Sequence, residues 1–441
     1  MIQIPELLLK IFFSMLPGFL FTGLCLNREI LTAGREPFPV PQLSSGIHLC
    51  YNVPRRRTVC KIHSEMRHSI MKILILSCNT GEGHNSAGKA LAEYARLQGD
   101  EAEFMDIMML GGKRVSHFVG GGYVSVVKHA PALFSLLYKI GGLVSSSRHK
   151  SPVYYANALL AGRLKRCLDE NDFDVIVTPH LFPAETLTYM KRKKMLRQKV
   201  VAVETDYTCI PFWEETECDY YILPHPSLIG EFAGKGIPEE KLKPFGIPVR
   251  PAFSKPGKKA EARKICRIPE DASVYLIMSG SMGFGKVNLF VARLLRRLGP
   301  NEYIIVICGS NQKLRKVLHT AFGRHPQVRI LGYTEHISAY MDACDVIFTK
   351  PGGLTSTEAA VKGIPIVHTR PIPGCETKNL EFFTERGLSV TAPKMGGQID
   401  AGQELLHDRA RREEMCAKQR QVIPRNAAAE IWRLLRELSE E

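Results

Sequence analysis

The sequence lacks several features that mark other classes of protein. None of its twelve cysteines belongs to a C-x-x-C pair, which argues against a zinc site or a disulfide framework. Cys308 and Cys344 instead lie inside apolar, strand-like runs, so we expect reduced, buried thiols in a cytosolic protein. The glycine-rich turn at 350–353 matches neither the P-loop nor the G-x-G-x-x-G pattern, so those two nucleotide-binding motifs do not explain it.

The N-terminal apolar run is too short for a good transmembrane helix. Residues 11–26 are apolar but include Pro17 and Gly18, whereas a spanning helix needs about 20 apolar residues. The segment that starts at Met71 begins like many Rossmann-type domains. We therefore expect Met71 to be the true start and 1–70 to be an upstream extension, disordered or untranslated.

Acidic residues are outnumbered by basic ones, and the excess is uneven. The formal net charge is +15, and residues 111–200 alone carry +10. Such a patch attracts polyanions, either nucleic acid or a membrane rich in anionic lipid. This stretch is aliphatic and glycine-rich, without the interleaved aromatics that stack on bases, so we expect an anionic membrane partner and no nucleic acid. The predicted membrane-docking and lipid-acceptor region is 115–168.

From Met71 onward, short apolar runs alternate with amphipathic segments, which is typical of a parallel sheet flanked by helices. The Pro- and Lys-rich stretch Pro248–Lys259 reads as an interdomain linker, and the same plan follows it. The predicted strands are Lys72–Ser77, Val175–Thr178, Val200–Val203, Tyr220–Leu223, Val274–Ser279, Tyr303–Cys308, Val328–Leu331, Asp345–Thr349 and Ile364–His368. The predicted helices include Ser86–Gln98, Asn288–Leu298 and Ala427–Leu438. We expect an α/β protein with two Rossmann-like domains, 71–248 and 249–424, facing across a cleft.

Residues 345–379 contain the pattern most indicative of a ligand. The strand Asp345–Thr349 runs into a glycine pair at 352–353, and a helix is expected to open at about Leu354. Glycines let the backbone approach a ligand, and a helix N-terminus attracts phosphate. Glu358, about one turn into that helix, could accept hydrogen bonds from sugar hydroxyls. The plain alternative is a βα turn with no ligand.

Four ordered motifs make the chain resemble a known family over about 71–425. They are Ser77–His84, Thr205-Asp206, Gly246–Arg250 and the region 345–379. They resemble the family of the monogalactosyldiacylglycerol synthases and the bacterial processive diacylglycerol glucosyltransferases. They are more distantly similar to the GlcNAc transferase that completes the lipid-linked peptidoglycan precursor. One departure is Cys375, where the family usually has Gln; a thiol is a weaker hydrogen-bond partner, so the choice of hexose is exposed to this change.

The resemblance implies a GT-B fold and an inverting transfer of a hexose, with glucose expected, from a UDP-sugar to diacylglycerol at the cytoplasmic membrane face. It also implies that the helix in 425–441 crosses back onto the first domain. The expected donor-binding residues are Arg250, Gly280, Ser281, Gly283, Gly332, Tyr333, Gly352, Gly353, Thr355, Glu358, Glu376 and Asn379. Among them the resemblance places Gly332 and Tyr333 at the uracil, Glu358 at the ribose, and Glu376 and Asn379 at the hexose. For Arg250 alone, a surface ion pair is the simpler interpretation.

Two residues compete as the catalytic base. His84 ends the first glycine-rich loop and could take the proton from an acceptor hydroxyl, while Asp206 also follows a predicted strand. His84 could instead position a phosphate or cap the helix. The resemblance implies Gly81, Gly83 and Trp213 as acceptor-binding residues, although apart from it the default role of a tryptophan is in the core. No D-x-D motif occurs in the predicted strand-end loops, so we expect no metal and no cofactor, with protein dipoles and Arg250 stabilising the leaving group.

Other functions stay open at this point. A UDP-GlcNAc transferase acting on a polyprenyl-diphosphate-linked sugar would explain the basic patch equally well. A nucleotide-sugar 2-epimerase needs no membrane patch, and a non-catalytic UDP-sugar sensor would bind the donor without turnover. Transfer to a two-chain lipid fits the long apolar stretch best.

Overall fold

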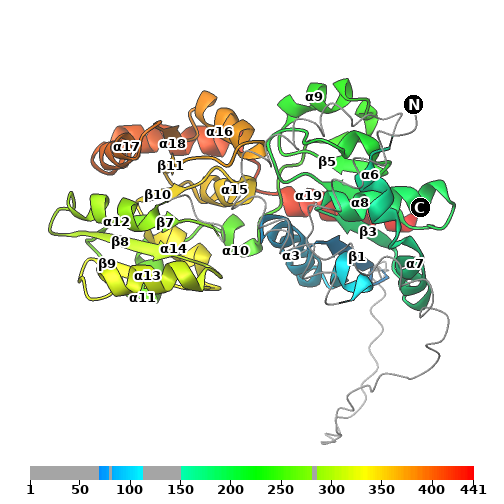
Figure 1. Cartoon of the computed structure of the whole chain (residues 1–441), viewed down its shortest axis with the longest axis horizontal. Coiled ribbons are helices and arrows are strands. Elements are labelled where there is room, and N and C mark those ends of the chain that lie inside the picture. The colour runs from blue at the N-terminus through cyan, green and yellow to red at the C-terminus, as the bar shows by residue number, and fades with distance from the viewer. Residues whose placement is uncertain (1–68, 79–81, 113–149, 281–285) are drawn as a thin grey trace, which may run out of the picture. The chain divides into compact units, whose positions relative to one another are not determined.

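The computed structural model describes residues 69–78, 82–112, 150–280 and 286–441 (Figure 1). Ile70–Glu441 forms one compact unit, which contains every element described below. Gly81, Ser281, Gly283 and most of the predicted docking region lie outside the described residues, as does the predicted extension 1–70 apart from its last two positions.

This unit is built on two six-stranded sheets, and all strand pairings are parallel. The sheets have the orders β2-β1-β3-β4-β5-β6 and β12-β11-β10-β7-β8-β9. Their strands are β1 (Lys72–Ser77), β2 (Glu101–Asp106), β3 (Val175–Thr178), β4 (Lys199–Val203), β5 (Tyr220–Ile222), β6 (Leu242–Lys243), β7 (Ser273–Met278), β8 (Glu302–Ile307), β9 (Val328–Leu331), β10 (Val346–Thr349), β11 (Ile366–His368) and β12 (Val390–Thr391). The predicted α/β architecture with two Rossmann-like halves is confirmed.

Helices connect the strands and cover both faces of each sheet. The α-helices are α3 (Glu82–Leu97), α6 (Pro152–Ala158), α7 (Ala161–Glu170), α8 (Leu181–Arg192), α9 (Ile229–Gly234), α10 (Pro251–Ser254), α11 (Lys259–Cys266), α12 (Val287–Leu295), α13 (Gln312–Phe322), α14 (Ile337–Ala343), α15 (Gly353–Lys362), α16 (Cys375–Glu385), α17 (Met395–His407), α18 (Arg409–Val422) and α19 (Ala427–Glu440). Short 3₁₀ turns are η1 (Ile107–Gly111), η2 (Trp213–Glu215), η3 (Pro226–Leu228) and η4 (Glu239–Lys241).

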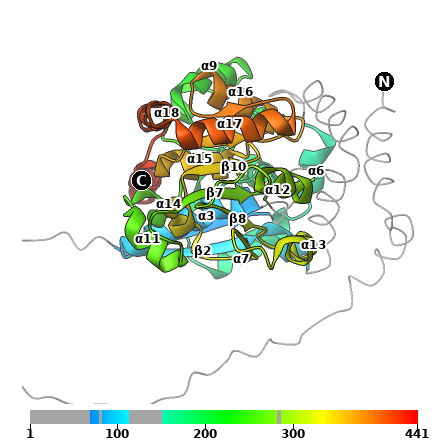
Figure 2. The ribbon, with the colours of Figure 1, turned by 90° about the vertical axis from the view of Figure 1, so that its left-hand side faces the viewer.

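The core follows the alternation of side chains along the central strands. In β7, Val274 and Leu276 pack with α11, α14 and α15, while Tyr275 and Ile277 pack with α12, α13 and α17. Figure 2 shows α11 and α14 on one side of this sheet and α12 and α13 on the other. Because both faces are buried, these strands are continuous apolar runs rather than alternating ones.

The C-terminal helix α19 returns to the first sheet. Its Ile431 and Leu435 lie in the same buried cluster as Ile75 of β1. The indole nitrogen of Trp432 donates to Asp100 Oδ2 at 2.7 Å, and Arg436 pairs with the same carboxylate. The last helix therefore covers the outer face of the first half, the position that the resemblance implied for it.

Three strands, β2, β6 and β12, were not predicted, and two segments predicted as a loop and a linker contain helix in the structure. Helix α3 begins at Glu82 rather than Ser86, so Gly83 and His84 lie in its first turn and not in a loop. The side chain of Asn85 accepts a hydrogen bond from Ser77 Oγ at 2.7 Å, which ties this early turn to the end of β1. The predicted linker 248–259 contains helix α10, since Pro251 suits a helix start and Phe253 is buried.

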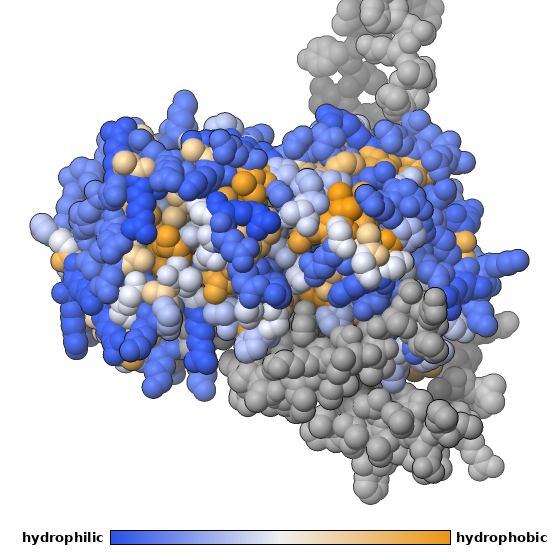
Figure 3. Space-filling view, turned by 90° about the horizontal axis from the view of Figure 1, so that it is seen from above, coloured by the Kyte–Doolittle hydropathy of each residue, from blue (hydrophilic) through white to orange (hydrophobic). Residues whose placement is uncertain are grey.

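The surface shown in Figure 3 is mostly hydrophilic, with separate apolar patches rather than one continuous apolar face. Of the predicted docking region, residues 150–168 are described, and there Tyr155 and Leu159 are 58% and 80% exposed. Within the described ranges, no helix combines the length and the apolar character needed to span a bilayer.

Candidate active site

Two helix N-termini face the same edge of the second sheet. Helices α15 and α16 follow the adjacent parallel strands β10 and β11, and each begins after a glycine, Gly352 and Gly374. Neither glycine can cap its helix with a side chain, and Gly374 has a positive φ of 117°. The N–H groups of the first helical turns therefore lack side-chain acceptors at these caps, and their partial positive charge favours an anion.

Lys350, just before the glycine turn, lies beside Gly280 and pairs with a carboxylate of α16. Its ammonium pairs with Glu376, whose other carboxylate oxygen accepts from the Ile372 amide at 2.8 Å. The side chains are 17% and 8% exposed. A Cβ on Gly280, whose φ is +65°, would lie 3.1 Å from Lys350 Cε. Lys350 was not among the predicted site residues, although a lysine at a strand end, separated from a glycine pair only by Pro351, was a usable signal.

Glu358 and Arg250 lie near each other, but Arg250 has another partner. Burial raises the pKa of Glu358 to about 8, and the Arg250 charge opposes this rise. Arg250 Nε donates to Glu93 Oε2 of α3 at 2.7 Å, in a half-exposed ion pair. The simpler interpretation of Arg250, an ion pair, thus describes this structure. Glu93 was not predicted as a partner of Arg250, because nothing in the sequence distinguishes it from other carboxylates on a helix surface.

Contacts within the first half favour one tautomer of the His84 ring. Its Nδ1 lies 2.9 Å from the Pro179 carbonyl oxygen and 2.8 Å from Thr205 Oγ1. A carbonyl can only accept, so Nδ1 carries a proton and Nε2 is left as the basic nitrogen of the neutral ring. Burial lowers the pKa of His84, with Asp206 and the Pro179 carbonyl acting in the opposite direction. The ring is therefore neutral near pH 7, as a general base requires.

The loop after β4 brings Asp206 to the second half. Asn379 Nδ2 donates to Asp206 Oδ1 at 2.7 Å, and the next amide, that of Tyr207, donates to Asn379 Oδ1 at 2.6 Å. A Cβ on Gly353 would lie 1.9 Å from the carbonyl oxygen of Thr205. The structure therefore brings His84 and Asp206 to the glycine turn that precedes α15.

The remaining predicted residues have varied environments. Tyr333 is 69% exposed, Thr355 is half-buried in the first turn of α15, and Gly83 is exposed with open space around it. Gly332 lies beside the Arg315 side chain. Trp213 is 2% exposed and packs edge-on against Tyr221 in the core of the first half. Its default core role is therefore realised here, and its contact with an acceptor stays a prediction.

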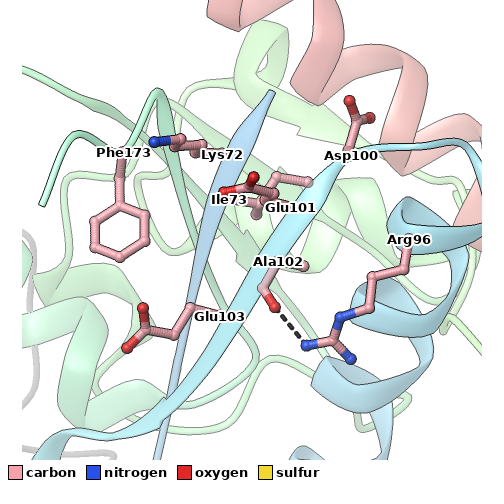
Figure 4. A pocket seen from close by; sticks show the side chains of 8 residues that line it. All are labelled: Lys72, Ile73, Arg96, Asp100, Glu101, Ala102, Glu103 and Phe173. Atoms are coloured by element: carbon pink, nitrogen blue, oxygen red, sulfur yellow. Dashed lines mark hydrogen bonds between the residues drawn. The ribbon is translucent and has the colours of Figure 1, made fainter. Parts of the chain in front are cut away.

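A surface hollow of about 390 Å³ lies at the amino ends of strands β1 and β2 of the first sheet (Figure 4). It is lined by Lys72, Ile73, Arg96, Asp100, Glu101, Ala102, Glu103 and Phe173. These residues surround the amino ends of β1 and β2, whereas His84 and Asp206 follow the carboxyl ends of β1 and β4. The hollow is thus separate from the candidate active site. The described parts of the chain contain no group of three His, Cys, Asp or Glu residues placed to hold a metal ion.

Comparisons with known proteins identify the family. The monogalactosyldiacylglycerol (MGDG) synthase family matches residues 84–249, and the glycosyltransferase family 28 C-terminal domain matches residues 274–371. A processive diacylglycerol beta-glucosyltransferase of Bacillus pumilus (strain SAFR-032) is 28% identical over 349 residues, which cover 78% of this chain and 89% of that protein.

A plant protein supports the same family, and a crystal structure shares the fold. The probable monogalactosyldiacylglycerol synthase 2, chloroplastic, of Oryza sativa subsp. japonica is 30% identical over 339 residues, or 72% of this chain and 70% of that protein. The crystal structure of Acinetobacter baumannii MurG shares the fold, with a TM-score of 0.55 and 15% identity over 83% of this chain and 99% of that one. The predicted resemblance and GT-B fold are confirmed, and the chain belongs to the monogalactosyldiacylglycerol synthase family of glycosyltransferases.

Proposed function

We propose that this protein transfers glucose from UDP-glucose to diacylglycerol with inversion at the anomeric carbon. The reaction takes place at the cytoplasmic face of the membrane, with the enzyme bound peripherally. Neither a metal ion nor a cofactor takes part.

The observation that carries the proposal is the meeting of two kinds of groups at one place. The second half presents the uncapped N-termini of α15 and α16 together with Lys350, which suit a diphosphate. The first half presents His84 and Asp206, two candidate bases, at the same turn, since Thr205 touches both His84 and Gly353. A donor bound by the helix ends would thus lie beside a group able to accept a proton.

The chemistry follows from this arrangement. A base, His84 through Nε2 or Asp206, accepts the proton of an acceptor hydroxyl as its oxygen attacks the anomeric carbon. The bond from that carbon to the β-phosphate oxygen breaks, and UDP leaves with the electron pair. Lys350, Arg250 and the helix N–H groups stabilise the charge that develops on the diphosphate. One displacement inverts the configuration.

The acceptor and the hexose are supported by different observations. Relatives named for diacylglycerol glucosyl transfer and for monogalactosyldiacylglycerol synthesis are 28% and 30% identical, so overall identity does not choose between the two sugars. Glucose is the hexose that the family resemblance led us to expect, and the transfer assay below decides between the two sugars. Diacylglycerol is supported by both sets of names and by the +10 charge of residues 111–200 beside apolar runs.

Incubation with radiolabelled UDP-glucose and vesicles containing diacylglycerol and anionic lipid tests the proposal, with the lipids separated afterwards. A labelled glycolipid is expected, in equal amount with and without a chelator. UDP-galactose, and UDP-GlcNAc with a polyprenyl-diphosphate sugar, serve as parallel substrates. Preferential transfer of galactose or GlcNAc would overturn the glucose assignment. Binding of UDP-glucose without any transfer would show that the protein is a UDP-sugar sensor and not an enzyme. Activity that is lost with a chelator and restored by magnesium would contradict metal independence.

A further inference from the structure

Asn379 uses both of its amide hydrogens and its oxygen within the protein. The side chain is fully buried on α16. Its Nδ2 donates to Asp206 Oδ1 at 2.7 Å and to the Pro351 carbonyl at 3.1 Å, and its Oδ1 accepts from the Tyr207 amide at 2.6 Å. Turning the amide over would place its oxygen against a carboxylate and a carbonyl, so this orientation is the one that the partners permit.

The loop that carries Asp206 is anchored on the same side. The hydroxyl of Tyr207 lies 2.7 Å from Thr357 Oγ1 of α15. The Tyr207 ring packs on Phe382 and Phe383 of α16, with centroids 4.3 and 5.1 Å away. The backbone beside Asp206 is therefore docked on the two helices whose N-termini we assign to the donor, and Asn379 fixes the carboxylate itself.

We propose that Asn379 is a positioning residue, which holds the Asp206 carboxylate for proton transfer from the opposite half of the enzyme. This inference rests on the proposed function, in which Asp206 is one of the two candidate bases. Its consequence is that the proton acceptor is set in place by the donor-binding half. The two halves must be joined, as they are here, for Asp206 to be in position.

A variant of Asn379 should show a different kinetic defect if Asn379 positions Asp206 than if it contacts the hexose. With both N–H groups engaged, the Asn379 amide acts on the carboxylate, so its loss should lower kcat and leave the donor KM nearly unchanged. The ionisable groups that interact with Asp206 are His84 from α3, Glu204 beside it in the chain, and Cys375 from α16. A change at Asn379 should therefore also alter the pH dependence of turnover.

The test is Asn379→Asp in the full-length protein, assayed with UDP-glucose and diacylglycerol vesicles. This near-isosteric change replaces the donating group by a second carboxylate facing Asp206. We expect kcat to fall at least about tenfold, the loss of roughly one charge-assisted hydrogen bond. The donor KM should change less than about twofold, and the acidic limb of the kcat profile should move to higher pH, because two adjacent carboxylates retain a proton more readily.

Two further variants keep the test decisive. Glu385→Gln, on the exposed face of the same helix, should match the wild type in kcat, KM and pH profile. Tyr207→Phe removes the bond to Thr357 and keeps the packed ring, so it should lower kcat about threefold at constant donor KM even if Asn379→Asp fails to fold. A raised donor KM with unchanged kcat and pH profile in Asn379→Asp would assign Asn379 to the hexose instead. Wild-type kcat in Tyr207→Phe would equally overturn the proposal.

The proposed function is tested separately by wild-type turnover. If the wild type transfers no sugar, the proposed function fails before any variant is compared. If it transfers sugar and the variants behave as the wild type, only the positioning role of Asn379 fails.

Discussion

Gly353 and Thr205 come from opposite halves of the enzyme and are packed too closely for any side chain at position 353. A Cβ there would lie 1.9 Å from the Thr205 carbonyl oxygen and 3.0 Å from its carbon. Backbone atoms cannot move aside as the end of a flexible side chain can. The second glycine of the pair is therefore needed for the contact between the halves, whereas the neighbouring Gly352 has open space around its Cα.

The two glycines should consequently fail in different ways when changed to alanine. Gly353→Ala forces the loop of Thr205 away from α15, and we expect a loss of stability of at least about 1–3 kcal/mol, together with loss of turnover. Gly352→Ala should leave the unfolding curve almost unchanged, because its φ of −75° suits any residue. It should nevertheless raise the donor KM, since a methyl group would occupy the space assigned to phosphate. Urea unfolding and steady-state kinetics measure both effects, and equal stabilities for the two variants would contradict the packing argument.

Glu358 should make stability depend on pH. Its pKa is raised by burial from the usual 4.5 to about 8, so the folded protein keeps a proton that the unfolded chain releases above pH 4.5. Stability linked to this group is therefore full below about pH 4.5 and falls as the pH rises towards 8. Glu358→Gln does not titrate, so its Tm relative to the wild type should rise between pH 5 and about pH 8 and level off above that pH. A difference that stays constant over this range would show that Glu358 ionises normally.

The buried pair of Lys350 and Glu376 should show strong coupling. Lys350→Met leaves the Glu376 carboxylate buried without its cation, which we expect to cost about 3–5 kcal/mol of stability. The double variant Lys350→Met/Glu376→Gln removes the stranded charge and should recover most of that loss. Denaturant unfolding of the four proteins in this cycle gives the coupling energy. Additive effects would mean that the two side chains do not depend on each other. Both variants should bind UDP more weakly than the wild type, because each lacks the cation assigned to the diphosphate.

The choice between His84 and Asp206 can be made at saturating donor. Removal of a true general base should lower kcat about 10²–10⁴-fold, with little change in donor affinity. Because burial lowers the pKa of His84, a His84 base predicts that wild-type kcat falls only below the usual histidine range as the medium is acidified. Comparison of His84→Ala with Asp206→Asn decides the assignment, and the variant that keeps its turnover is excluded as the base.

The sequence predicted the central strands well because strands such as β3 and β10 are buried on both faces. The strands β2, β6 and β12, which are short or partly exposed, were not predicted. Lys72–Ser77, Val175–Thr178 and Val328–Leu331 begin and end in the structure where the apolar runs do. The start of α3 was four residues late in the prediction, since Glu82 and Gly83 are typical of a loop when read alone. Their helical state is tied to the Ser77–Asn85 contact. Cys308 and Cys344 are free and buried, as predicted.

The candidate site was predicted only in part, because some of its residues are defined by partners that are distant in the sequence. Glu358 and the glycine pair could be recognised because a strand, a turn and a helix follow one another in the chain. Lys350 went unassigned because its partner Glu376 is 26 positions away, and Glu93 because its partner Arg250 is 157 positions away. An ordinary charged residue becomes part of a site through the partner that folding places beside it.

Local order along the chain thus determined the alternation of strands and helices, the glycine turns at strand ends and the family to which they belong. These features depend on backbone conformation and apolar periodicity, which neighbouring residues specify. Tertiary structure alone decided that Asp206 meets Asn379 across 173 positions and that His84 keeps its proton on Nδ1. Such contacts form only when both sheets have folded and their strand ends come together, because hydrogen bonds act over about 3 Å and distant segments must be brought within that range.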